Sequence, residues 1–177
     1  MSSWNFKGLR GSMLEEMVNR TNEQYRKKGL ALIQKVPTPI IPIKFNKEYR
    51  HITLAYFEQK STVDYIGAVQ GLPVCFDAKE CKTDSFPLIN VHQHQIQFMA
   101  DFERQKGIAF LLLYFSGRGF FYYLRFFEFC QYVERAERGG RKRFKFQELD
   151  PEYELKQKHG IFLHYLEGVQ KDLLERD

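Results

Sequence analysis

The chain has 177 residues, of which 44% are hydrophobic and 16% aromatic, a length and composition that suit a single folded domain with a substantial core. No apolar run reaches the roughly 18 residues that a transmembrane helix needs, and the segment 1–20 is polar and mixed in charge, which excludes a secretory signal. The three cysteines lack paired spacing, which argues against a disulfide scaffold or a zinc site and favours the reducing cytoplasm.

Basic residues are concentrated near the C-terminus. The formal net charge is +5, and the segment 138–145 holds five basic residues and no acid. Such a block suits a phosphate-rich partner, and Arg138, Arg141, Lys142 and Arg143 are candidates for nucleic-acid contacts. Considered alone, the segment fits a solvated basic tail equally well.

The first third of the chain predicts a helix, a strand and a projection. Ser12 can cap a helix that ends near Gly29, where glycine suits the C-terminal cap. A short buried strand at 30–34 follows, and the prolines that come next exclude a helix. Within 40–60, two apolar stretches surround a charged turn, which predicts a long hairpin that extends away from the main sheet.

The rest of the chain predicts strands and helices of one mixed sheet. Alternating and continuous apolar patterns indicate four strands, the last of them at 120–124, and helical spacing indicates three helices. In chain order these elements are strands at 62–69 and 72–79, a helix at 90–105, strands at 107–115 and 120–124, and helices near 125–135 and 163–174. The fold class is therefore α/β, a mixed β-sheet flanked by helices, with a projecting stalk hairpin.

Two aspartates on the paired strands are the first candidates for chemistry. A hairpin would bring Asp64 and Asp77 close together, and two like charges held close in a site of low dielectric repel each other. A divalent cation such as Mg²⁺ resolves that repulsion. Spacing alone favours two solvent-facing acids, with Asp77 paired to Lys79. The apolar residues that precede Asp77 favour a buried carboxylate, which is costly without a partner.

Other polar residues have two interpretations each. Because strand side chains alternate, Lys79 shares a face with Asp77, either as its ion-pair partner or as a cation that orients water and offsets phosphoryl charge. Thr62 can lend oxygen to a metal or simply favour a strand. Glu15 completes a capping box with Ser12. Gln95 is either an amide ligand or an ordinary helix-surface residue.

A series of short motifs resembles the RecU Holliday junction resolvases, a family with the restriction-endonuclease-like nuclease fold of the PD-(D/E)xK superfamily. The motifs occur in order and at compatible gaps between about residues 8 and 145. They are Arg10–Glu15, Lys35–Pro39, Ala55–Phe57, Ser61–Gly67, Phe76–Glu80, Ser85–Leu88, His94–Ile96 and Gly139–Lys142.

The resemblance implies an active site and an assembly. A Mg²⁺ ion, for which Mn²⁺ can substitute, would be held by Thr62, Asp64, Asp77 and Gln95, with Lys79 stabilising the transition state. It also implies a homodimer with two active sites, and a stalk at about 38–60 that enters the centre of the junction. Three further residues follow from the matched motifs: Glu15 near the site, and Arg10 and Lys35 as DNA contacts.

The sequence departs from the family at one position, because RecU proteins usually have Glu where this chain has Asp77. Aspartate is one methylene shorter, so its oxygen falls back by roughly 1.5 Å, the length of one carbon–carbon bond. The rate and the preferred metal are therefore in question. The basic C-terminal segment, about 138–177, matches weakly beyond residue 145.

These observations predict a single nuclease domain over 1–177 that is a crossover junction endodeoxyribonuclease. We expect a cytoplasmic, Mg²⁺-dependent homodimer, with no membrane partner, that makes symmetric nicks in four-way DNA junctions and binds other branched DNA during recombination and repair. Recombination proteins are possible partners. The alternatives are a junction-binding, strand-annealing protein that does not cleave, and a duplex-cutting nuclease of the same fold.

Overall fold

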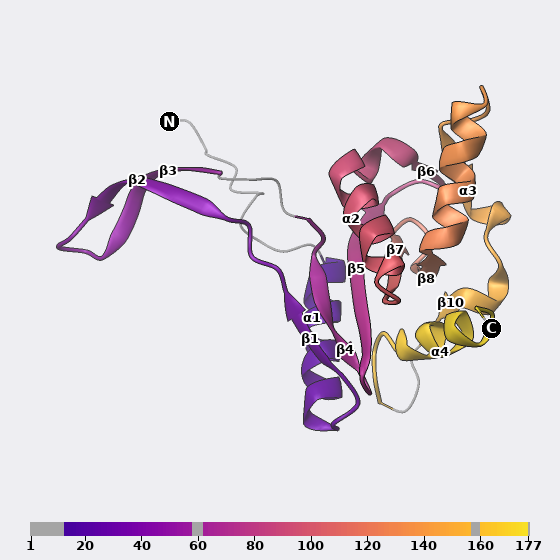
Figure 1. The fold of residues 1–177 in the computed structure, drawn as a ribbon, viewed down its shortest axis with the longest axis horizontal. Helices are drawn as coiled ribbons and strands as arrows, with labels where there is room; N and C mark the ends of the chain where they lie inside the picture. The colour runs from indigo at the N-terminus through magenta and orange to yellow at the C-terminus, as the bar shows by residue number, and fades with distance from the viewer. Residues whose placement is uncertain (1–12, 58–61, 157–159, 177) are drawn as a thin grey trace.

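A six-stranded mixed sheet forms the centre of the computed structural model, which describes residues 13–57, 62–156 and 160–176 (Figure 1). The strand order is β1-β4-β5-β7-β8-β10, and β5 and β7 are parallel while the other neighbours are antiparallel. The strands are β1 (Leu32–Lys35), β4 (Tyr65–Val69), β5 (Leu72–Cys81), β7 (Ile108–Phe115), β8 (Phe120–Arg125) and β10 (Glu154–Leu155).

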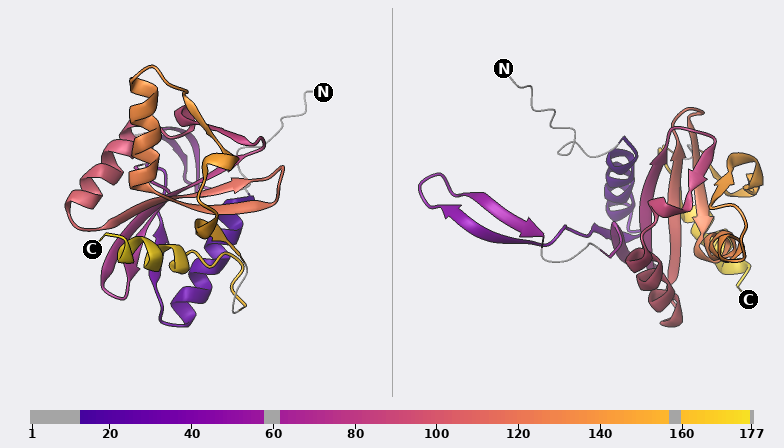
Figure 2. Two further views of the ribbon diagram at one scale, coloured as in Figure 1. Left: turned by 90° about the vertical axis from the view of Figure 1, so that its right-hand side faces the viewer. Right: turned by 90° about the horizontal axis from the view of Figure 1, so that it is seen from above.

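Within the described ranges, four α-helices cover the sheet, and together they confirm the expected mixed α/β architecture (Figure 2). They are α1 (Met13–Lys27), α2 (Gln93–Arg104), α3 (Phe126–Glu137) and α4 (Leu166–Leu174). The 3₁₀ turn Leu88–Asn90 precedes α2, so the helix predicted from residue 90 begins three residues later. In the described part of the chain, no helix is both long and apolar enough to cross a membrane.

Four stacked aromatic rings form a row across the four central strands. Tyr65 on β4 stacks on Phe76 of β5 at 4.8 Å, Phe76 on Phe110 of β7 at 4.7 Å, and Phe110 on Tyr123 of β8 at 4.4 Å between ring centroids. All four side chains are completely buried. Because side chains alternate along a strand, this aromatic row on one face places Asp77 on the opposite face.

The predicted projection is confirmed. Strands β2 (Ile40–Asn46) and β3 (His51–Phe57) pair with each other in a separate two-stranded sheet, which extends far from the body in Figure 1 and in the right-hand view of Figure 2. We call residues 40–57 the stalk. It exposes a set of large apolar side chains: Ile40, Ile43, Phe45, Tyr49, Ile52, Leu54 and Tyr56. An isolated two-stranded ribbon is marginally stable in water, so an apolar surface of this kind favours a partner.

Several strands differ from the sequence predictions. The strand expected as buried at 30–34 is β1, Leu32–Lys35, which lies at the sheet edge with mostly exposed residues, and β5 continues to Cys81. The strand at 120–124 is not the last, because β9 (Arg143–Lys145) pairs with β6 (Ser85–Pro87) and β10 pairs with β8. Strand β4 begins at Tyr65 and not at Thr62. The physical reason is that the Asp64 N–H donates to the side chain of Asp77 and not to a backbone carbonyl of the ladder.

We predict that Gly168→Ala destabilises the protein even though alanine favours a helix by about 1 kcal/mol over glycine. A Cβ at this position of α4 would lie 2.5 Å from Cγ of the buried Tyr123, and overpacking of this kind costs about 1–3 kcal/mol. Urea unfolding measures the change. The exposed Gln170→Ala in the same helix is the control, with an expected change within about 0.5 kcal/mol. A more stable Gly168→Ala protein would contradict the close packing of α4 on Tyr123.

Candidate functional site

Asp64 and Asp77 lie directly opposite each other. The register pairs Tyr65 with Phe76, so one step further along the same ladder brings Asp64 beside Asp77. The Asp64 N–H donates to Oδ1 of Asp77 at 3.1 Å, and Oδ2 of Asp64 accepts from the N–H of Ala78 at 2.9 Å. The N–H of Asp64 therefore holds the carboxylate of Asp77, and the N–H of Ala78, the residue after Asp77, holds the carboxylate of Asp64. The two acids lie close enough for the charge of Asp77 to act on Asp64, and their binding of a common cation stays a prediction.

Lys79 and Gln95 complete the surroundings of Asp77, whose side chain is fully buried. Nζ of Lys79 lies 2.6 Å from Oδ2 of Asp77, and Nε2 of Gln95 donates to both carboxylate oxygens at 3.1 and 3.0 Å. The Lys79 side chain keeps 20% of its surface exposed, so one side of the cluster remains open to a substrate. Together, these bonds satisfy the buried charge.

The Gln95 amide is oriented differently from the sequence hypothesis. Its Oε1 accepts from the backbone N–H of His92, the N-cap residue of α2, at 3.0 Å, while its nitrogen faces Asp77. Ligation of a metal through the amide oxygen would require the amide to turn. In the arrangement observed, Gln95 holds Asp77.

The pKa of Asp64 is raised from its ordinary value to about 7. Burial is the main cause, followed by the charge of Asp77, while the hydrogen bond from Ala78 and the charge of Lys79 act in the opposite direction. Two acids and one lysine thus leave the cluster short of positive charge near neutral pH. Either a proton or a cation at Asp64 relieves the repulsion.

The donor set fits a small divalent cation. Among the described residues, no group of three or more His, Cys, Asp and Glu side chains is placed to hold a metal. Mg²⁺, however, commonly binds through one or two carboxylates and completes its shell with waters and substrate phosphate oxygens. The opposed pair Asp64 and Asp77 offers that minimum, in a place where the charge balance favours a cation.

The remaining candidates near the site lie at its margins. Thr62 is half-buried and precedes β4 by three residues. Glu15 on α1 forms an ion pair with Lys35, at the end of β1, with Nζ and Oε2 2.5 Å apart. Lys35 was predicted to contact DNA, and in the structure its ammonium group is paired with the carboxylate of Glu15. Arg10, like the capping residue Ser12, lies outside the described residues.

The structure also places Tyr65 and Asn19 in this region, and no sequence pattern predicted either residue there. The buried phenol of Tyr65 donates to Oδ1 of Asn19 at 2.9 Å and to the carbonyl of Glu15 at 3.4 Å. Burial raises its pKa well above the usual range, and the charges of Glu15, Asp64 and Asp77 add to the rise. These hydrogen bonds attach α1 to the strand that follows Asp64. A tyrosine in an apolar strand gives no hint of them.

The basic block is a surface loop. Arg138, Arg141, Lys142 and Arg143 are all exposed, and they run from the end of α3 into β9. The loop is tied to the body through its backbone, because the carbonyl of Lys142 accepts from the N–H of Leu88 at 3.1 Å. The four side chains lie outside the core, where a phosphate-bearing partner can reach them, and Arg138 also pairs with Glu134 at 3.4 Å.

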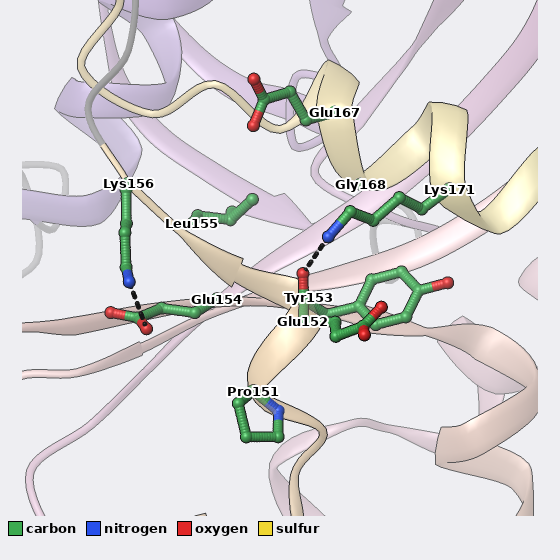
Figure 3. A pocket seen from close by; sticks show the side chains of 9 residues that line it. All are labelled: Pro151, Glu152, Tyr153, Glu154, Leu155, Lys156, Glu167, Gly168 and Lys171. Carbon is green, nitrogen blue, oxygen red and sulfur yellow. Dashed lines mark hydrogen bonds and ion pairs between the residues drawn. The ribbon is translucent and has the colours of Figure 1, made fainter.

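A separate pocket between β10 and α4 is not part of this cluster (Figure 3). Both lysines of this pocket already have partners: Nζ of Lys171 donates to the backbone carbonyl of Glu152 at 2.5 Å, and Lys156 pairs with Glu154 at 3.1 Å. None of the candidate site residues lines it. The opposed aspartates, and not this pocket, are therefore the candidate site.

Two acids and a lysine presented by paired strands form the kind of site that a divalent cation and a phosphate group require. Comparison with known proteins gives the family. The family model described as recombination protein U (RecU) matches residues 9–171, so the chain belongs to the RecU family.

Several relatives carry the name Holliday junction resolvase RecU. The one from Pediococcus pentosaceus is 37% identical over 169 residues, which cover 93% of this chain and 84% of the relative. The one from Lactococcus lactis subsp. lactis is 40% identical over 93% of this chain and 78% of its own length. Among solved structures, a Holliday junction resolvase from Archaeoglobus fulgidus has 14% identity and a TM-score of 0.41, covering 80% of this chain and 87% of that one.

We predict that Asp64→Asn stabilises the metal-free protein at pH 8 by about 1–3 kcal/mol. A raised carboxyl pKa means that the folded state binds more protons than the unfolded state between about pH 4 and 7, so wild-type stability falls as pH rises through that window. The amide removes this loss and can still accept from Ala78. Urea unfolding in EDTA at pH 4 and pH 8 measures both values, and the gain should nearly vanish at pH 4.

The exposed Asp101→Asn, the same chemical change on α2, is the matched control and should show no such gain at pH 8. Adding Mg²⁺ should stabilise the wild type and narrow its difference from Asp64→Asn. If Asp64→Asn were destabilised equally at both pH values, Asp64 would not be the acid of the pair whose pKa is raised by folding.

Proposed function

We propose that this protein is a Holliday junction resolvase, a Mg²⁺-dependent endonuclease that cuts four-way DNA junctions during recombination and repair in the cytoplasm. The observation that carries the proposal is the buried, opposed pair Asp64 and Asp77 beside Lys79. Membership of the RecU family supports the same conclusion, since relatives at 37–40% identity over 93% of this chain bear that name.

In the proposed mechanism, Asp64 and Asp77 would hold the cation, and Thr62 and the amide oxygen of Gln95 would complete its ligands. When bound, such a cation would lower the pKa of a coordinated water and offset charge on the scissile phosphate. The Lys79 ammonium, 2.6 Å from Asp77, orients the attacking water and offsets the negative charge that develops on the phosphorus oxygens. Glu15 supports the site from α1. The products are 5′-phosphate and 3′-hydroxyl ends.

The proposed assembly is a homodimer of single nuclease domains. Two sites related by a dyad nick two opposing strands symmetrically. The stalk enters the centre of the junction, where its exposed apolar side chains meet bases, and the basic loop binds backbone phosphates. Arg10 and Lys35 add backbone contacts. Other branched DNA and recombination proteins are further proposed partners, and Mn²⁺ substitutes for Mg²⁺.

One observation favours a second candidate function, a junction-binding protein that does not cleave. Both oxygens of Asp77 already accept hydrogen bonds from protein donors, and aspartate is shorter than the glutamate usual in the family. A site that holds its carboxylate so completely can be structural. A duplex-cutting nuclease of the same fold is the third candidate.

A cleavage assay on a synthetic four-way junction separates these candidates. We expect the wild type to cut with Mg²⁺ or Mn²⁺ and not with EDTA, and Asp77→Asn to lower the rate by about 10²–10³-fold or more while junction binding stays within a few-fold. Glu80→Gln, on the same strand but exposed and facing away from Asp77, is the matched control and should cut normally.

Each alternative has its own signature in that assay. A wild type that binds the junction and cuts with neither metal is the binding protein, and equal cutting of plain duplex indicates a duplex nuclease. Normal cutting by Asp77→Asn would refute the site assignment.

We predict that replacing Arg141, Lys142 and Arg143 together by Ala flattens the salt dependence of junction binding. Loss of three phosphate contacts should lower the slope of log K against log salt by about 2–3. The control replaces Arg26, Lys27 and Lys28, three exposed basic residues in and just beyond the last turn of α1, at the opposite end of the sheet in Figure 1. It removes the same charge and should leave the slope nearly unchanged. Equal effects of the two triple variants would exclude a specific role for the loop.

A further inference from the structure

The stalk joins the body at the candidate site itself. Its outgoing arm leaves the end of β1 through Val36, and its return arm reaches β4 through Asp64. The N–H of Val36 donates to the carbonyl oxygen of Asp64 at 2.8 Å. This bond continues the β1–β4 ladder, which pairs Lys35 with Tyr65, by one more step. We call Lys35 and Val36 the stalk root.

Asp64 is therefore held from two sides. Strand β5 holds its N–H, through Oδ1 of Asp77 at 3.1 Å, and its carboxylate, through the N–H of Ala78 at 2.9 Å. The stalk root holds its carbonyl, through Val36. The bonds to its N–H and to its carbonyl fix the peptide planes on both sides of Asp64, and the bond from Ala78 fixes the carboxylate itself.

A second contact anchors the outgoing arm. Nζ of Lys35 lies 2.5 Å from Oε2 of Glu15 on α1, so the residue before Val36 is fixed to the body through its side chain. Within the described residues, β2 and β3 are hydrogen-bonded in strand ladders only to each other. Displacement of the stalk by DNA is therefore resisted at the root, beside Asp64.

We propose that the backbone amide of Val36 is a positioning group for Asp64, so that the stalk has two separable parts. The root orients a carboxylate of the metal site, and the hairpin at 40–57 contacts DNA. The inference rests on the proposed function, since it assigns Asp64 to the metal. Groups that hydrogen-bond to metal ligands typically account for about 10–100-fold in metal affinity or activity.

The test removes one hydrogen-bond donor, the N–H of Val36. Val36→Pro lacks the N–H, and α-hydroxyvaline at position 36, which puts an ester in place of the amide, lacks it without the proline ring. The comparison is a shortened stalk, in which a Gly-Ser turn replaces residues 42–55 and the Val36–Asp64 bond is kept. All variants are checked by circular dichroism and then compared with the wild type for Mn²⁺ binding by electron paramagnetic resonance, junction affinity, and single-turnover cleavage.

The two root variants should bind Mn²⁺ about 10-fold more weakly and cleave about 10–100-fold more slowly, with junction affinity within about two-fold of wild type. Val36→Ala, which keeps the backbone N–H, is the control and should bind Mn²⁺ and cleave the junction as the wild type does. The shortened stalk should show the opposite pattern, with lower preference for junctions over duplex and wild-type Mn²⁺ affinity.

Wild-type Mn²⁺ affinity and cleavage in the ester variant would overturn the inference, even if Val36→Pro failed to fold. A wild type that binds Mn²⁺ but cuts no junction would instead overturn the proposed function. The inference about Val36 would still be tested in that case, because the Mn²⁺ affinity of the variants reports whether Val36 positions Asp64.

Discussion

The opposition of Asp64 and Asp77 is the constraint around which the rest of the structure is arranged. Two acids in register on neighbouring strands, one of them fully buried, are unfavourable unless every polar atom is satisfied. The fold supplies an ammonium from Lys79, an amide from Gln95 and a backbone N–H from Ala78. On the other face, stacked aromatic rings pack across β4, β5 and β7, the strands beside these groups.

The cluster is better suited to binding than to stability. The raised pKa of Asp64 shows that the protein pays a free-energy cost near neutral pH to keep two carboxylates together. Sites that store such a cost are commonly functional, because the ligand that relieves it gains affinity from the relief. A divalent cation is the ligand whose charge and preference for oxygen match this pair.

The parts that face DNA in the proposed function connect closely to this cluster. Val36 and Asp64 lie next to the ends of β1 and β4, and the basic loop pairs through β9 with β6, the strand that follows β5. The stalk and the basic loop are therefore connected to the candidate site through residues next to β1, β4 and β5.

The sequence by itself determined the local features. The period of two placed Asp77 and Lys79 on one face, and the prolines and paired apolar stretches indicated the projection, because these signals depend only on residues close in the chain. Tertiary structure decided the rest: the start of β4 at Tyr65, the amide of Gln95 directed at Asp77, the pairing of Lys35 with Glu15, and the bond from Val36 to Asp64. Each of these depends on which distant groups arrive within hydrogen-bonding distance once the strands pair, and spacing along the chain does not encode that.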